Sequence, residues 1–167
     1  MADYKKVYQG HWAESAEREK FGRRIVESYG YTLEKQGLGC ESTEYIPYGK
    51  QDKTHEKGMP DYKIKGTNKM VEITGTAAPV SPVSDLWIRK DKVEYAKNHP
   101  EYEIIAIHIL DHFHLARWIY MKDCANYPLK TKSINSVTTD FHIIPAYSKE
   151  VKEIKERKNL TSHKKSL

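Results

Sequence analysis

The segment MPDYKIKGTNKMVEITGT, residues 59–76, constrains the fold more than any other part of this sequence. Apolar and polar residues alternate in both of its halves, which is typical of half-buried strands. The apolar positions are Tyr62, Ile64, Val71 and Ile73. Turn-forming residues, 66–68, separate the two halves. The segment therefore predicts a β-hairpin, around which we expect the rest of the chain to be organised.

Each strand of this hairpin carries one carboxylate, Asp61 in the first and Glu72 in the second. If the turn holds an even number of residues, Lys63 pairs with Glu72. Asp61 then pairs with Thr74, and directly paired side chains point to the same face. The two carboxylates would be diagonal neighbours, roughly 7 Å apart at the backbone, and could share one divalent cation. An odd turn would send them to opposite faces, so the predicted metal site depends on register.

The same residues carry a resemblance to a known family. Asp61 follows a proline, and ten residues separate it from the run Glu72-Ile73-Thr74. This pattern resembles the signature of the PD-(D/E)XK nucleases, which implies that Asp61 and Glu72 bind Mg²⁺ or Mn²⁺. The backbone carbonyl of Ile73 is the natural third protein donor to such a hard cation. Thr74 stands where the family has a lysine that positions the attacking water, and threonine can hydrogen-bond that water but adds no charge.

The first predicted helix supplies a further acidic candidate. Residues 12–29 have apolar side chains at helical spacing, and Gly30 ends the pattern where helices commonly end. Glu19 precedes Gly30 by about three helical turns, which is similar to the first-helix glutamate that faces the metal in the family. Glu17 and Glu27 are the alternatives, and a glutamate on a surface helix is ordinarily only solvated.

A basic helix is predicted after the hairpin. It ends at Asn98, ahead of a proline, and begins at Asp85 or Arg89. Some members of the family carry the motif lysine on the following helix, and Lys92 is our candidate for that role. The alternative, a Lys92 that is merely a solvated helix residue, carries equal weight.

The charge of the chain favours a polyanionic partner. The net charge is +5 and the pI is near 9.0, and the resemblance makes DNA the expected partner. Arg89, Lys90 and Lys63 are the candidate nucleic-acid contacts. The densest basic run, residues 149–165, either contacts phosphates or forms a solvated, frayed tail. A homodimer is expected by analogy, because two active sites suit two strands.

The predicted order of elements is helix, strand, hairpin, helix, strand, strand, late strand and helix. Residues 103–110 are a short apolar run typical of a strand buried on both faces. Residues 36–58 are mostly loop, with a short strand expected near residues 45–48. A late strand is expected at 140–144, and a charged helix after Pro145. Elements within residues 13–110 reproduce the αβββαβ core of the PD-(D/E)XK fold. We therefore expect one α/β domain with a mixed (α+β) sheet over residues 1–167, with a core at about 13–145 and a basic C-terminal helix or tail at 148–167.

Several classes of protein are disfavoured by the sequence. No apolar run approaches the roughly 18 residues of a membrane span, and the first residues lack the apolar core of a secretory signal, so we expect a cytoplasmic protein. Cys40 and Cys124 have no zinc-ligand spacing and are expected to be reduced. His112 and His114 could bind a transition metal, but no further ligand completes the set, and turn histidines are the default interpretation. No phosphate-binding loop is present, so no nucleotide cofactor is expected.

These observations define three hypotheses. The first is a metal-dependent nuclease, an endonuclease acting on DNA, with Asp61 and Glu72 as ligands and Glu19, Thr74 and Lys92 in support. The second is a catalytically inactive relative that binds nucleic acid or a protein partner, since loss of one catalytic charge can cost roughly 3 to 4 kcal/mol of barrier. The third is an unrelated α/β domain in which the motif occurs by chance.

Overall fold

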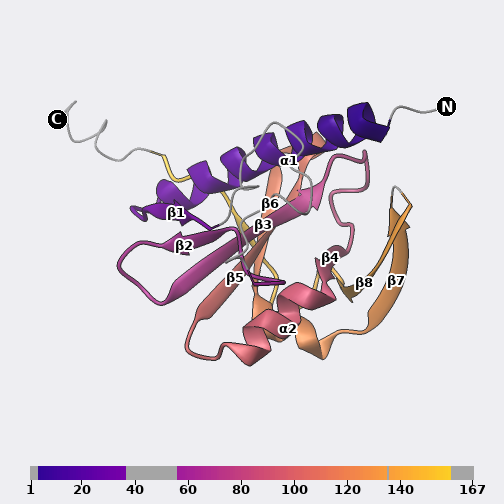
Figure 1. Cartoon of the computed structure of the whole chain (residues 1–167). Coiled ribbons are helices and arrows are strands. Elements are labelled where there is room, and N and C mark those ends of the chain that lie inside the picture. Colours follow the sequence, from indigo (N-terminus) through magenta and orange to yellow (C-terminus); the bar gives the residue numbers. More distant parts are fainter. Residues whose placement is uncertain (1–3, 37–55, 135, 159–167) are drawn as a thin grey trace.

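The computed structural model describes residues 4–36, 56–134 and 136–158. Within this part of the chain a six-stranded mixed sheet forms the centre of the protein, and a three-stranded antiparallel sheet lies beside it (Figure 1). The large sheet has the order β1 (Leu33–Lys35), β2 (Tyr62–Ile64), β3 (Lys69–Thr76), β5 (Glu103–Leu110), β6 (Leu115–Tyr120) and β9 (Lys152–Ile154). The small sheet has the order β4 (Leu86–Arg89), β8 (Val137–Ile144) and β7 (Leu129–Ile134).

Helices cover both faces of the large sheet. The long helix α1 (Tyr4–Glu27) lies across one face, and α2 (Lys90–Asn98) lies on the other side beside the small sheet (Figure 1). Two short 3-10 helices, η2 (Asp111–Phe113) and η3 (Met121–Asn126), connect strands. The fold is therefore an α+β arrangement with a mixed sheet, as predicted at this level. No helix in the described residues is long and apolar enough to cross a membrane.

The alternation in β3 divides the core into two layers. Val71 and Ile73 pack under α1 with Ile25, whereas Met70 packs on the opposite side with Val93 of α2. Successive side chains of a strand point to opposite faces, so one strand serves both layers. β3 runs parallel to β5, and such a pair requires a crossover, which here contains β4 and α2. The crossover brings α2 to the face of the sheet that carries Glu72.

The hairpin has the predicted faces but not the predicted register. Tyr62 pairs with Val71 and Lys63 with Met70, two positions away from the expected pairing of Lys63 with Glu72. A shift of one residue would have reversed every side chain, but a shift of two leaves each on its face. Continuing the pairing by one step places Asp61 directly opposite Glu72. The carboxylates are therefore direct rather than diagonal neighbours.

Most predicted elements are present, with altered ends. β5 coincides with the predicted strand at 103–110, and the late strand is longer, at Val137–Ile144. The predicted helix start at Asp85 is wrong, because Leu86–Arg89 form β4 and the helix begins at Lys90. β7 was not predicted. The strand expected at residues 45–48 lies outside the described residues.

The charged helix predicted after Pro145 is wrong over the described residues. The chain turns there, with the Ser148 N–H donating to the Pro145 carbonyl, and then forms β9. β9 pairs antiparallel with β6, and half-buried Ile154 packs against the cluster under α1. Covering the open edge of β6 in this way satisfies backbone groups that a surface helix would have left exposed.

Candidate metal-binding site

A pocket of about 180 Å³ opens between α1, β3, β4 and α2. It is lined by the predicted metal ligands and by the residues expected to support them. These are Glu19, Asp61, Glu72, Ile73, Thr74 and Lys92. Arg89, one of the three predicted nucleic-acid contacts, also lines it. The hairpin, the first helix and the crossover helix thus bring together residues that are up to 73 positions apart in sequence (92 − 19).

Asp61 and Glu72 meet at the floor of the pocket. Their carboxyl groups lie close enough to form a hydrogen bond when one of them carries a proton, and the Ile73 backbone N–H also donates to Asp61. Glu72 is only 4% exposed. Burial raises the pKa of Asp61, and burial together with the adjacent Asp61 charge raises the pKa of Glu72 well above its usual range. Two buried carboxylates this close repel each other, so the pair favours either a shared proton or a bound cation.

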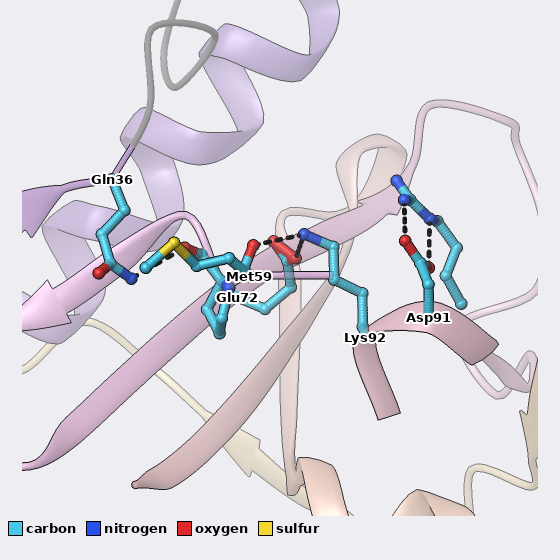
Figure 2. A network of polar contacts seen from close by, with 7 residues as sticks. Gln36, Met59, Glu72, Asp91 and Lys92 are labelled. Atoms are coloured by element: carbon cyan, nitrogen blue, oxygen red, sulfur yellow. Dashed lines mark hydrogen bonds and ion pairs between the residues drawn. The ribbon is translucent and has the colours of Figure 1, made fainter. Parts of the chain in front are cut away.

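Lys92 reaches the pair from α2. Its Nζ lies 2.6 Å from Glu72 Oε2 and donates to the Met59 carbonyl at 2.9 Å (Figure 2). Burial alone would lower the pKa of Lys92, but the carboxylates of Glu72 and Asp61 outweigh it and raise the pKa. Lys92 therefore stays charged, and it is not the solvated helix residue of the alternative interpretation.

Two of the described basic side chains that line the pocket form hydrogen-bonded ion pairs with aspartates. Arg18 makes a bidentate pair with Asp111, at 2.9 and 2.8 Å. Arg89 does the same with Asp91, at 3.0 and 2.5 Å (Figure 2). Among the described residues that line the pocket, Lys92 is the base that faces the carboxyl groups of Asp61 and Glu72. The charge of Glu19 further raises the pKa of Asp61. Two buried carboxyl groups thus face one ammonium in the described part of the pocket, an arrangement that favours a bound cation.

Two predicted nucleic-acid contacts lie outside this pocket. Lys90, the first residue of α2, forms an ion pair with Glu94 at 3.7 Å. Lys63 lies in β2 opposite Met70 and does not line the pocket. Arg89 is the member of the set that borders the carboxylates.

The donor set fits a hard divalent cation. Asp61 and Glu72 offer carboxylate oxygens, which Mg²⁺ and Mn²⁺ prefer, and Ile73 adds a backbone position on the same lining. Within the described residues no group of three or more His, Cys, Asp or Glu side chains is arranged to hold a metal ion. The alternative site at His112 and His114 thus gains no third ligand from this part of the chain.

A buried polar pair lies next to Thr74 and was not predicted. His108 of β5 pairs with Thr74 of β3 on one side and with Arg117 of β6 on the other. Arg117 lies 3.0 Å from His108 Nδ1 and also donates to the Ser84 carbonyl. A guanidinium can only donate, so Nδ1 accepts and the imidazole is neutral. Burial, with the charge of Arg117, lowers the pKa of His108 to about 3. The pair ties the loop that leads into β4 to the sheet.

Sequence reasoning also missed two contributors to the pocket, Arg18 and Ser15 of α1, and the Met59 carbonyl that holds Lys92. Ser15 lies four residues before Glu19 and so on the same side of α1, which is a signal that could have found it, whereas Arg18 is adjacent to Glu19 in sequence and gives no such signal. A backbone carbonyl leaves no signal in a sequence.

Comparisons of the chain with models of protein families, with curated proteins and with solved structures found no match.

Proposed function

We propose that this protein is a metal-dependent nuclease that hydrolyses phosphodiester bonds of DNA, an endonuclease of the PD-(D/E)XK type. The observation that carries the proposal is the meeting of Asp61, Glu72 and Lys92 in one pocket. Asp61 and Glu72 were expected from the motif and Lys92 from the resemblance to the family, and the three side chains lie together in the pocket, which supports the proposal. A chance occurrence of the motif would not require this convergence.

The order of elements supports the same proposal. α1, β1, β2, β3, α2 and β5 follow one another as in the αβββαβ core of that family, with β4 inserted between β3 and α2. In this arrangement the acidic pair lies on the second and third strands, and the crossover helix lies over it. The resemblance of the motif and the order of elements are independent, so together they are more specific than either alone.

The residues of the pocket divide the chemical work. Asp61 and Glu72 would hold Mg²⁺ or Mn²⁺, and the bound ion would supply an activated water and neutralise charge on the phosphate. Lys92 provides the positive charge that Thr74 lacks at the motif position, and the Met59 carbonyl fixes its ammonium. Thr74 contributes a hydroxyl for hydrogen bonding. Glu19 adds negative charge that favours binding of the cation.

Cleavage of supercoiled plasmid in Mg²⁺ or Mn²⁺ tests the proposal. The wild type should nick and linearise the plasmid, and Glu72→Ala should reduce the rate by about a hundredfold or more. Glu153→Ala, an exposed acid on β9, is the matched control and should cleave normally. Equal cleavage by the wild type and Glu72→Ala would identify a contaminating nuclease and refute the proposal.

One observation favours a second candidate, a catalytically inactive relative that binds nucleic acid. In the pocket the Lys92 ammonium already forms an ion pair with Glu72 at 2.6 Å, so a lysine rather than a metal ion lies against that carboxylate. A protein of this kind would bind DNA with strong salt dependence. It would release no product in Mg²⁺ or Mn²⁺, which separates it from the nuclease in the same plasmid assay.

The nuclease proposal includes a homodimer. Each chain carries one carboxylate pair, and cleavage of both strands of a duplex is simplest with two sites. Light scattering at assay concentrations checks this, with a dimer mass expected.

A further inference from the structure

The small sheet has a face that points away from the large sheet. Within β4, Leu86 and Ile88 are buried in the core, so Trp87 and Arg89 point to the other side. Phe141 of β8 is paired with Arg89 and therefore shares its face. Trp87 of β4 and Phe141 of β8 thus lie on the same side of the sheet as Arg89.

The neighbouring strand β7 adds two lysines. Lys130 pairs with Phe141, and Lys132 pairs with Thr139, so both lysines point to the same side. The Nζ of Lys132 lies 4.4 Å from the centroid of the Trp87 ring, and the Trp87 and Phe141 rings are 6.1 Å apart. We call this surface the outer face and define it by Trp87, Arg89, Lys130, Lys132 and Phe141.

The outer face is basic and open to solvent. Trp87 is 38% exposed, and the Arg89 side chain is 51% exposed. Within β4, β7 and β8 the acidic residue is Asp140. It pairs with Thr131 on the side of the small sheet opposite to the outer face, and it accepts a hydrogen bond of 2.6 Å from the Thr131 hydroxyl. Asp91 of α2 partners Arg89, but it does not neutralise the two lysines. The surface therefore combines positive charge with the exposed ring of Trp87 and the half-buried ring of Phe141.

The outer face is continuous with the candidate metal site. Arg89 belongs to both, because its side chain lines the pocket that holds Asp61 and Glu72. β4 leads directly into α2, which carries Lys92 (Figure 1). Arg89 therefore connects the pocket to the outer face.

We propose that the outer face binds a single-stranded segment of DNA, with bases on Trp87 and Phe141 and phosphates at Arg89, Lys130 and Lys132. Ring faces stack on unpaired bases, which a duplex hides inside its helix. A base that stacks on Trp87 displaces the Lys132 ammonium, whose flexible stem allows it to turn to a phosphate. The binding claim stands apart from catalysis. The consequence, a preference for cleaving DNA that contains an unpaired strand, rests on the proposed nuclease function.

Fluorescence anisotropy in EDTA tests the binding claim without cleavage. A labelled oligothymidylate of about 20 nucleotides exceeds the site size of one small domain. Trp87→Ala should weaken its binding roughly tenfold, since loss of one stacked base has about this effect, and Trp87→Phe should restore most of the affinity. The matched control is Phe113→Ala, an exposed aromatic on η2, which should bind like the wild type. A thermal melt like that of the wild type verifies that each variant folds.

The lysines give a second, independent readout. A Lys130→Ala and Lys132→Ala double variant should lower the salt dependence of binding, with a slope smaller by about 1.4 for two lost phosphate contacts on a single strand. Lys65→Ala, at the exposed hairpin turn, serves as the control and should leave the slope unchanged. An unchanged slope in the double variant would overturn the assignment of phosphates to this face.

Competition with a blunt duplex of the same length completes the test. Single-stranded DNA should compete at least fivefold more strongly than the duplex, a difference within the range of one stacked base. Equal competition by the duplex, or wild-type binding by Trp87→Ala, would overturn the proposed surface even if plasmid cleavage depends on Glu72. Loss of binding in Trp87→Ala with no cleavage in any metal would instead sustain the surface and reject the nuclease.

Discussion

Substitution of Lys92 by methionine separates catalysis from folding at the candidate site. The ammonium has two close partners, Glu72 Oε2 at 2.6 Å and the Met59 carbonyl at 2.9 Å, and the side chains of Lys92 and Glu72 are 12% and 5% exposed. Methionine keeps the volume and removes the charge. Removing one partner of a buried ion pair costs about 3 to 5 kcal/mol when the other charge remains. Here the carboxyl can take up a proton instead, so the cost should depend on pH.

The sign of that dependence follows from the pKa of Glu72. Its folded-state pKa is already raised above the unfolded value, and loss of the Lys92 charge raises it further. A raised carboxyl pKa destabilises the fold as the pH climbs above the unfolded value, and the penalty disappears at lower pH. Lys92→Met should therefore lose several kcal/mol relative to the wild type at about pH 8, and much less at about pH 5. For a chain of this size each kcal/mol shifts Tm by roughly 2 to 4 °C.

Thermal melts at the two pH values measure this effect, and plasmid cleavage measures the catalytic one. The cleavage rate of Lys92→Met should fall by about a hundredfold, as expected for a lost charge at the scissile phosphate. Lys97→Met, an exposed lysine near the end of α2, is the matched control and should change neither property appreciably. An equal Tm loss at both pH values, or cleavage at the wild-type rate, would refute the assigned role of Lys92.

Three further predictions concern the surroundings of the site. Asp61→Asn should raise Tm in EDTA, because it removes repulsion between buried carboxyls. It should also abolish the stabilisation by Mn²⁺, which for the wild type is about 2.7 kcal/mol at a hundredfold excess over Kd. A Tm shift with Mn²⁺ that persists in Asp61→Asn would contradict this. The pKa of His108 in the folded protein is lowered to about 3. As the pH falls below about 6.5, the imidazole therefore takes up a proton in the unfolded chain but not in the folded protein, and the free energy of unfolding falls by about 1.4 kcal/mol per pH unit. His108→Gln should therefore flatten the acid limb of the stability curve measured by urea titration, and an unchanged limb would argue against the buried neutral imidazole. Gly75 has φ +151°, and a Cβ there would lie 1.9 Å from the Ile109 carbonyl oxygen. Gly75→Ala should therefore lower the free energy of unfolding by about 3 kcal/mol or more, against about 1 kcal/mol for Gly66→Ala in the open turn. Equal losses of stability in urea titrations of the two variants would show that β3 and β5 are not so close.

The faces of the hairpin were predictable from sequence, whereas its register was not. Alternation fixes which side chains share a face, and this placed Asp61 and Glu72 together. The pairing depends on where the turn is centred. The observed turn, residues 65–68, is centred one residue earlier than expected, which moves the pairing by two positions without changing any face. The structure brought the carboxylates closer than the diagonal arrangement that we predicted.

Elements that depend on long-range pairing were the ones missed. β9 is charged and short, and only its pairing with β6 and the contact of Ile154 with the core make it a strand. A helix that starts at Asp85, one of the two predicted starts, would include β4, because Leu86 and Val93 also fit a helical stripe. In the structure Leu86 faces the core from the small sheet. Local patterns carry no information about such partners.

Lys92 illustrates what a motif supplies and what the fold must add. Its sequence position shows a basic helix and no more, since a lysine at the start of a helix is ordinarily solvated. The parallel pairing of β3 with β5 requires the crossover that lays α2 over Glu72, and this brings the ammonium to the carboxylate. The polar pair of His108 and Arg117 beside Thr74 was hidden for the same reason, because it forms only when three strands align.

A manganese titration tests the central claim most directly, with bound Mn²⁺ followed by electron paramagnetic resonance and plasmid cleavage followed in the same samples. The wild type should bind Mn²⁺ at the Asp61 and Glu72 pair, and its cleavage rate should rise in proportion to the occupied fraction. Asp61→Asn should lose both together. Cleavage that proceeds without bound Mn²⁺, or that survives in Asp61→Asn, would contradict the assignment of this pocket as the catalytic centre of a nuclease.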